Sequence, residues 1–104
     1  MSTSQTILNV EDTPENRDLA RRILESEGYQ VVDAKNALEG IEKAVEIVPD
    51  LILMDINLPD LDGFTAVTRI RSYSQLKSVP ILALTARTVS DDRERAKAIG
   101  RWLP

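Results

Sequence analysis

The residues best suited to chemistry in this chain are three acids, Glu11, Asp12 and Asp55, which follow two short apolar runs. Ionised carboxylates that lie close together repel one another, and a divalent cation between them relieves the repulsion. The chain has no histidine and no cysteine, so imidazole and thiolate groups are excluded as ligands, bases and nucleophiles. Oxygen donors alone select a hard cation, and a few carboxylates completed by water suit Mg²⁺. The pattern predicts a Mg²⁺ site that binds phosphate-bearing partners.

Each candidate residue also has a simpler interpretation. Asp12 can cap the first helix, Thr85 can cap a fourth helix, and Asp55 can begin an exposed turn. Asp55 nevertheless interrupts the apolar run 51–56, where burying an isolated charge would be costly. Because all of these positions fall at expected strand ends, we favour one shared site.

A calcium-binding loop is a further possibility for the segment 55–60, which begins with alternating oxygen-bearing side chains. Such a loop needs an oxygen ligand at its fifth position and glycine at its sixth. Those positions hold Pro59 and Asp60, so the sequence excludes this site.

Short apolar runs alternate with segments of helical periodicity along the chain. Apolar runs of this kind are typical of strands buried on both faces, whereas apolar residues three and four apart indicate a helix with one buried face. The strands are expected at 7–10, 31–32, 51–54 and 79–84, and the helices at 15–27, 37–48 and 64–70, with a weaker fourth between 89 and 99.

Residues that favour turns and helix ends separate these segments. Thr13-Pro14 suits a helix start, with proline at the first helical position, and Gly28 suits a helix C-terminus. Pro49-Asp50 divides the second helix from the third strand, and Asp62-Gly63 forms a turn before the third helix.

The alternation of strands and helices predicts an α/β fold with a doubly wound parallel sheet. Functional groups of such sheets gather beyond the carboxyl ends of the strands, where the winding direction reverses. The segments at these ends are Glu11-Asp12, 55–57 and Thr85-Ala86. The first and third strands would be neighbours, so the three acids should meet.

Composition narrows the class of protein. A chain of 104 residues is expected to form one domain, and 42% apolar residues suffice for a core. The net charge of −4 argues against a nucleic-acid surface. Residues 1–6 lack the features of a signal peptide, and no apolar run approaches the roughly 18–20 residues that cross a bilayer. We therefore expect a cytoplasmic protein with neither nucleic acid nor membrane as a partner.

Four motifs together resemble the receiver domains of two-component response regulators. They are Ile7-Leu8-Asn9-Val10-Glu11-Asp12, Leu51-Ile52-Leu53-Met54-Asp55-Ile56-Asn57-Leu58-Pro59, Asp62-Gly63 and Ile81-Leu82-Ala83-Leu84-Thr85-Ala86. The likeness runs from about Thr6 to Gly100 and is closest to single-domain cell-division regulators and the receivers of hybrid kinases. It implies a flavodoxin-like fold with strand order 2-1-3-4.

The resemblance also implies a metal site. Asp12 would bind Mg²⁺ directly, Glu11 would act through water, and Asp55 together with the backbone carbonyl of Asn57 would complete the protein's ligands.

Signalling roles follow from the same resemblance. Asp55 would be the phosphoacceptor, taking a phosphoryl group from a histidine kinase or a histidine phosphotransfer protein. Thr85 would contact a phosphoryl oxygen and act as the switch, assisted by the backbone amide of Ala86. The output would be a contact with a downstream protein target. The chain would not be an enzyme beyond its own phosphorylation and dephosphorylation.

The C-terminus departs from the family pattern. Receivers continue into a fifth strand, a Lys-Pro pair and a fifth helix, whereas here only four residues, 101–104, follow Gly100. Lys97 lies within the expected fourth helix and does not replace the family lysine. We therefore expect 1–104 to be a C-terminally truncated receiver with impaired phosphorylation or switching. Its exposed fourth-strand edge predicts a homodimer or higher oligomer, or else poor folding.

Two other functions stay open. The first is a protein-interaction or oligomerisation module with a receiver-like fold that is not phosphorylated. The second is a Mg²⁺-dependent phosphatase of another α/β family. Those with an aspartyl nucleophile usually carry an acid–base aspartate two positions later, where this chain has Asn57.

Overall fold

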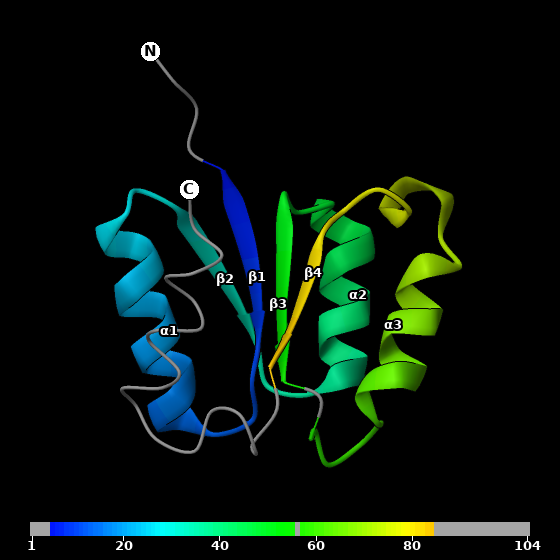
Figure 1. Ribbon diagram of the computed structural model, residues 1–104, viewed down its shortest axis with the longest axis horizontal. Coiled ribbons are helices and arrows are strands. Elements are labelled where there is room, and N and C mark those ends of the chain that lie inside the picture. The colour runs from blue at the N-terminus through cyan, green and yellow to red at the C-terminus, as the bar shows by residue number, and fades with distance from the viewer. Residues whose placement is uncertain (1–4, 56, 85–104) are drawn as a thin grey trace.

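The computed structural model describes residues 5–55 and 57–84, which fold into one parallel sheet with helices on both faces (Figure 1). The elements in chain order are β1 (Thr6–Val10), α1 (Pro14–Ser26), β2 (Gln30–Ala34), α2 (Ala37–Ile47), β3 (Leu51–Asp55), α3 (Gly63–Arg71), a 3₁₀ turn η1 (Ser74–Leu76) and β4 (Ile81–Leu84). The strands lie in the order β2-β1-β3-β4. The doubly wound α/β fold and its strand order are confirmed.

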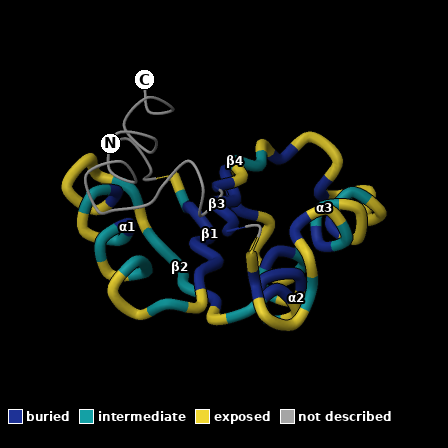
Figure 2. The backbone as a smooth tube through the Cα atoms, turned by 60° about the horizontal axis from the view of Figure 1, so that its bottom comes forward, coloured by how far each residue is buried: buried dark blue, intermediate teal, exposed yellow. Residues whose placement is uncertain are grey.

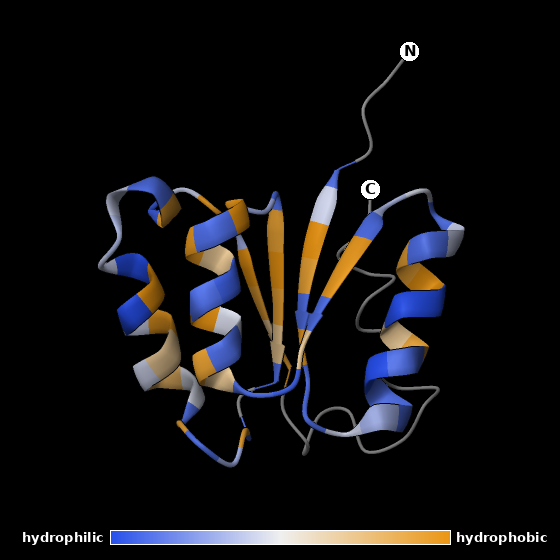
Figure 3. Ribbon diagram, turned by 180° about the vertical axis from the view of Figure 1, so that it is seen from behind, coloured by the Kyte–Doolittle hydropathy of each residue, from blue (hydrophilic) through white to orange (hydrophobic). Residues whose placement is uncertain are grey.

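The apolar core is divided by the sheet into two parts. In Figure 1, α1 covers one face over β1 and β2, while α2 and α3 cover the other. Every residue of β3 is buried, and Figure 2 shows the central strands as the most buried part of the described chain. Figure 3 shows why: the strands are apolar for most of their length, and the helices are apolar on one side only. A strand covered on both faces cannot alternate polar and apolar residues.

The residues expected at the starts of α1 and α3 are confirmed, although the helices run over Pro14–Ser26 and Gly63–Arg71 rather than over 15–27 and 64–70. Pro14 is the first residue of α1 and Thr13 its N-cap, and Gly28 follows the helix with a φ of +91° that favours glycine. Asp62 caps α3, because its carboxylate accepts a hydrogen bond from the backbone amide of Thr65 at 2.9 Å.

All four strands differ in their bounds from the sequence prediction. β1 begins at Thr6 rather than residue 7, and β3 ends at Asp55 rather than residue 54. β2 extends from Gln30 to Ala34 rather than over two residues, because it pairs with β1 along its whole length. β4 begins at Ile81 rather than Val79, because the Val79 amide donates to the carbonyl of Leu76 at 3.3 Å and Pro80 has no amide hydrogen. The expected fourth helix and the expected loss of a fifth strand concern residues outside the described part.

Helix α2 lies unusually close to β1 at Gly40. A Cβ atom built on Gly40 would lie 2.8 Å from a γ-methyl carbon of Val10, closer than carbon atoms pack. Val10 is buried and is the last residue of β1. The absence of a side chain at Gly40 therefore lets α2 rest directly on the strand that leads into the acidic pair.

None of the described helices is long and apolar enough to span a membrane. The longest of them, α1, has 13 residues, whereas a spanning helix needs about 20.

Candidate functional site

The three predicted acids meet at the carboxyl ends of β1 and β3. These strands are neighbours, with Val10 opposite Met54, so the residues that follow them emerge at the same edge of the sheet. One carboxylate oxygen from each of Glu11, Asp12 and Asp55 lies within 4.8 Å of the others. The sequence prediction that these acids would gather is correct.

The acids differ strongly in their exposure. Glu11 is 2% exposed and Asp55 is 8% exposed, whereas Asp12 is open to solvent. The amide of Glu11 donates to the carbonyl of Ala34 at 3.0 Å, which extends the β1–β2 hydrogen bonds past the end of the strand. Two of the carboxylates are thus held by the sheet, and the cluster opens to water beside the third. Buried charges need compensation, and a cation held among the three carboxylates is one way to supply it.

The loop after β3 orients the carboxylate of Asp55. The backbone amide of Asn57 donates to Asp55 Oδ1 at 2.9 Å, which restricts the rotation of the carboxylate. The same loop is held from its other end by Asp60, whose two oxygens accept hydrogen bonds from the amides of Ala37 and Leu38, each at 2.9 Å. The loop is thus held at the amide of Asn57, whose carbonyl is a predicted ligand, and at the carboxylate of Asp60.

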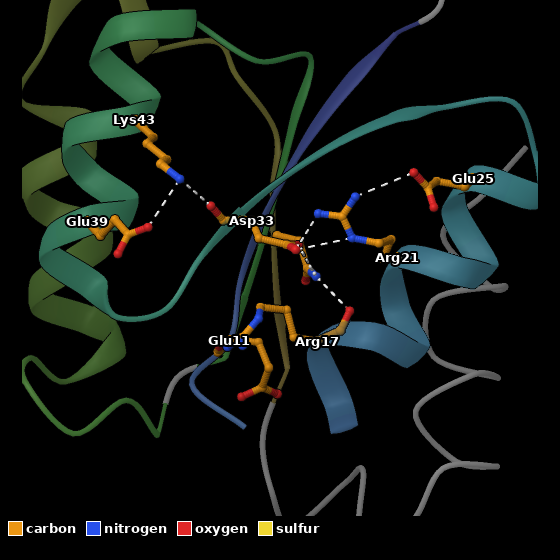
Figure 4. Close-up of polar contacts among 8 residues, drawn as sticks. Glu11, Arg17, Arg21, Glu25, Asp33, Glu39 and Lys43 are labelled. Atoms are coloured by element: carbon orange, nitrogen blue, oxygen red, sulfur yellow. Dashed lines mark hydrogen bonds and ion pairs between the residues drawn. The ribbon is translucent and has the colours of Figure 1, made fainter. Parts of the chain in front are cut away.

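Three contacts hold the turn between β1 and α1. The amide of Thr13 donates to Glu11 Oε2 at 3.3 Å. The guanidinium Nη1 of Arg17 donates to the carbonyl of Glu11 at 2.9 Å (Figure 4). It makes a longer contact of 3.5 Å with the carbonyl of Asp12.

The sequence reasoning missed both Arg17 and Asp60. Each acts through hydrogen bonds with backbone atoms, which leave no mark in the residue types of their partners. Asn9 could have indicated the polar contacts around Arg17. It is a polar residue inside the apolar strand β1, and a buried amide needs specific hydrogen-bond partners.

The cationic side chain of Lys43 is engaged away from the acidic cluster. Its ammonium nitrogen lies 3.1 Å from Glu39 and donates to the carbonyl of Asp33 at 2.6 Å (Figure 4). The carboxylate of Asp33 pairs with Arg21 on the opposite side of β2. This polar group braces β2 between α1 and α2, and its side chains are not members of the acidic cluster.

Thr85 and Ala86, the predicted phosphoryl contacts, lie outside the described residues. The structure places the strand that precedes them: β4 ends at Leu84, which is the register partner of Asp55.

The donor set fits a hard divalent cation. Glu11, Asp12 and Asp55 offer only oxygen atoms, close enough together to share one ion. The protein has neither histidine nor cysteine, so softer metals find no preferred ligand.

Comparison with known proteins gives the family. Residues 7–102 match the response regulator receiver domain. The chain belongs to this family. The receiver is 35% identical over 96 residues to the polar-differentiation response regulator DivK of Brucella anthropi, covering 92% of this chain and 78% of DivK. It is also 35% identical over 96 residues to the sensor histidine kinase CheAY of Helicobacter pylori, but that match spans only 12% of the kinase.

Solved structures agree with the fold. The receiver superposes on the chemotaxis response regulator CheY4 of Vibrio cholerae with a TM-score of 0.79 and 35% identity, covering 94% of this chain and 82% of CheY4. It matches the receiver domain of the sensor histidine kinase PA1611 of Pseudomonas aeruginosa with a TM-score of 0.79 and 39% identity, over 94% of this chain and 80% of the other. That structure holds a magnesium ion in its active-site cleft.

Family membership confirms the resemblance inferred from the motifs and assigns the chain to two-component signalling. Receiver domains are signalling domains that interact with histidine kinases or phosphotransfer proteins and with downstream targets.

Proposed function

We propose that this receiver is a phosphoacceptor and that Asp55 takes the phosphoryl group from a phosphohistidine on a histidine kinase or phosphotransfer protein. A carboxylate oxygen of Asp55 attacks phosphorus, an O–P bond forms, the P–N bond to the imidazole breaks, and the released imidazole takes a proton. The observation that carries this proposal is the position of Asp55, held at the carboxyl end of β3 within 4.8 Å of Glu11 and Asp12. Such an arrangement provides a fixed nucleophile beside a cation site.

The metal ligands are proposed from the same cluster. Asp12 and Asp55 would bind Mg²⁺ directly, Glu11 would act through water, and the backbone carbonyl of Asn57 would complete the protein's share. Bound Mg²⁺ supplies positive charge that offsets the charge of the carboxylates and of the phosphoryl group. The exposure of Asp12 supports its part, because its carboxylate faces the solvent from which an ion arrives.

The protein's own groups orient the reaction. The hydrogen bond from the Asn57 amide restricts the Asp55 carboxylate before the donor arrives, so less freedom is lost at the moment of attack. Burial of Asp55 limits access to one side of the cluster, where a phosphohistidine of a partner can approach.

The output is proposed to be a change in protein contacts. Thr85 would contact a phosphoryl oxygen, Ala86 would assist through its amide, and the surface that follows β4 would change its population of conformations. Support comes from the register, because the last residue of β4, Leu84, lies beside Asp55. Residues 1–104 would act as one receiver domain, and the cytoplasmic location expected from the sequence is part of the same proposal.

The test is a titration followed by backbone NMR, first with Mg²⁺ and then with beryllofluoride, a mimic of the phosphoryl group. We expect Mg²⁺ to shift the amides at the ends of β1 and β3, and beryllofluoride to shift them further. Asp55→Asn should abolish the beryllofluoride response and weaken Mg²⁺ binding. Asp18→Asn, which removes the same charge from the exposed surface of α1, should behave as the wild type.

The outcomes separate the candidate functions. Mg²⁺ binding without any beryllofluoride response would favour the interaction module, in which the acidic site is kept but phosphorylation is lost. No response to either would exclude the phosphoacceptor proposal for this chain. Steady turnover of a simple phosphate ester would instead indicate a phosphatase.

A further inference from the structure

The acidic turn between β1 and α1 is tied to the helix by one side chain. Arg17 reaches from α1 to the end of β1, where its Nη1 atom donates to the Glu11 carbonyl at 2.9 Å (Figure 4). The same atom lies 3.5 Å from the Asp12 carbonyl. The contacts are to carbonyl oxygens, not to carboxylates. Arg17 therefore holds the backbone of both acidic residues while its positive charge lies beside the cluster.

Arg17 is itself held in place by the buried amide of Asn9. The Nδ2 atom of Asn9 donates to the backbone carbonyl of Arg17 at 3.1 Å and to Asp33 Oδ1 at 3.2 Å. Asn9 is 1% exposed, and a buried amide left without partners would be costly. These bonds fix α1 against β1 at Arg17. The backbone from which the guanidinium extends is therefore held in place.

The far end of this hydrogen-bonded chain is an ion pair. Asp33 on β2 pairs with Arg21, one turn after Arg17 on α1. The bonds thus run without a break from Arg21 through Asp33, Asn9 and Arg17 to the carbonyl of Glu11. Linked hydrogen bonds of this kind restrain one another, and this restraint extends to the acidic turn.

We propose that Arg17 is a positioning residue for the cation site: it holds the Glu11–Asp12 backbone so that the two carboxylates face Asp55 despite their mutual repulsion. This inference rests on the proposed function, because the site that Arg17 positions is the proposed Mg²⁺ site. Both contacts are made by Nη1, and the planar guanidinium fixes the directions of its N–H bonds toward the two carbonyl oxygens. A lysine ammonium also has N–H donors, but it is a compact charge on a flexible stem without this fixed geometry.

The test compares Arg17→Gln and Arg17→Lys with Arg22→Gln. Arg22 is an exposed arginine of the same helix, so its loss changes the net charge equally without touching the turn. The first measurement is amide hydrogen exchange in metal-free protein, with the Thr13 amide as reporter because it is bonded to Glu11 Oε2. The second is the Mg²⁺ dissociation constant by calorimetry, with Asp12→Asn as the reference for a damaged site.

We expect faster exchange at Thr13 and about tenfold weaker Mg²⁺ binding in both Arg17 variants, as found when groups that orient metal ligands are removed. Arg22→Gln should match the wild type in both measurements. Wild-type exchange and affinity in Arg17→Gln would overturn the proposal. Full retention of both by Arg17→Lys would overturn the role given to the planar guanidinium, since any cationic donor at this position would then suffice.

The two proposals fail in different ways. If the wild type binds no Mg²⁺, the proposed function is wrong, and the exchange rates of the metal-free variants still decide whether Arg17 holds the turn. If the wild type binds Mg²⁺, Asp12→Asn does not, and Arg17→Gln equals the wild type, the site is real and Arg17 does not position it.

Discussion

The carboxylate of Asp60 accepts a hydrogen bond from the backbone amide of Ala37 at 2.9 Å, across 23 residues of sequence. Its second oxygen accepts a hydrogen bond from the amide of Leu38 at the same distance. A residue of the β3–α3 loop thereby caps the N-terminus of α2, where amides without helical partners favour a negative charge. The loop that orients Asp55 is thus fastened to the helix that lies on β1.

Removing this cap should lower stability. We expect Asp60→Ala to reduce the free energy of unfolding by about 1 kcal/mol, the usual effect of losing a helix cap. Urea denaturation provides the measurement. Glu42→Ala is the matched control, because it removes an exposed carboxylate of α2 that is not at the helix end. Equal loss in both variants would show that the cap contributes nothing.

The same contact predicts a dependence on pH. Burial is the largest single influence on Asp60 and opposes its ionisation, but hydrogen bonds from backbone amides, led by those of Leu38 and Ala37, together outweigh it. The net effect lowers the pKa below its ordinary value of 3.8. A pKa lowered by folding stabilises the protein above the unfolded pKa, and that contribution is lost as the pH falls through the folded pKa.

The free energy of unfolding of wild type and Asp60→Asn should therefore converge as the solution is acidified from about pH 5 to about pH 2. The comparison isolates Asp60, because Asp62, whose pKa is also lowered by its contacts with Thr65, is present in both proteins. Parallel curves over this range would contradict the prediction.

Gly40→Ala should destabilise the protein although alanine favours helices. The gain in helix propensity is about 1 kcal/mol, whereas forcing a methyl group into a packed contact costs about 1–3 kcal/mol. The added Cβ would lie 2.8 Å from a γ-carbon of buried Val10, which has little freedom to move. Thermal unfolding should show a lower Tm.

The double variant Val10→Ala/Gly40→Ala tests the cause of that loss. Removing the γ-methyl groups of Val10 makes room for the new methyl group, so the two substitutions should be less harmful together than the sum of each alone. Simple additivity would mean that the contact between α2 and β1 is not the source of the instability.

The acidic cluster should make stability respond to Mg²⁺. Without metal, Asp12→Asn is expected to raise the Tm, because one of three neighbouring negative charges is removed. Mg²⁺ at a hundred times its dissociation constant should stabilise the wild type by about 2.7 kcal/mol, and it should have much less effect on Asp12→Asn. Equal Mg²⁺ responses in the two proteins would place the ion elsewhere.

The homodimer or higher oligomer expected from the sequence stays a prediction. Within residues 5–55 and 57–84, β4 pairs with β3 on one side only. If association uses this edge, Ala83→Lys, at an exposed position of β4, should shift sedimentation toward the monomer, because lysine on an edge strand disfavours pairing. Thr68→Lys, at an exposed position of α3, is the control. A wild-type protein that sediments as a monomer would contradict the prediction.

The class of fold and the members of the acidic cluster follow from local patterns in the sequence. The alternation of apolar runs with amphipathic segments leaves few arrangements other than a parallel sheet, and the carboxyl ends of parallel strands meet at one edge. Glu11, Asp12 and Asp55 follow two such runs, so their meeting could be inferred from local patterns alone. The motifs around them also indicated the family correctly.

The tertiary structure decided what holds those acids in place. Arg17 binds the carbonyl of Glu11, and Asp60 binds the amides of Ala37 and Leu38. Every residue type offers the same carbonyl oxygen and almost every one the same amide, so no sequence pattern marks these partners. The full length of β2 was decided in the same way, by pairing with β1 rather than by its own residues. Side chains that bind a distant backbone find their partners only once the fold has brought the segments together.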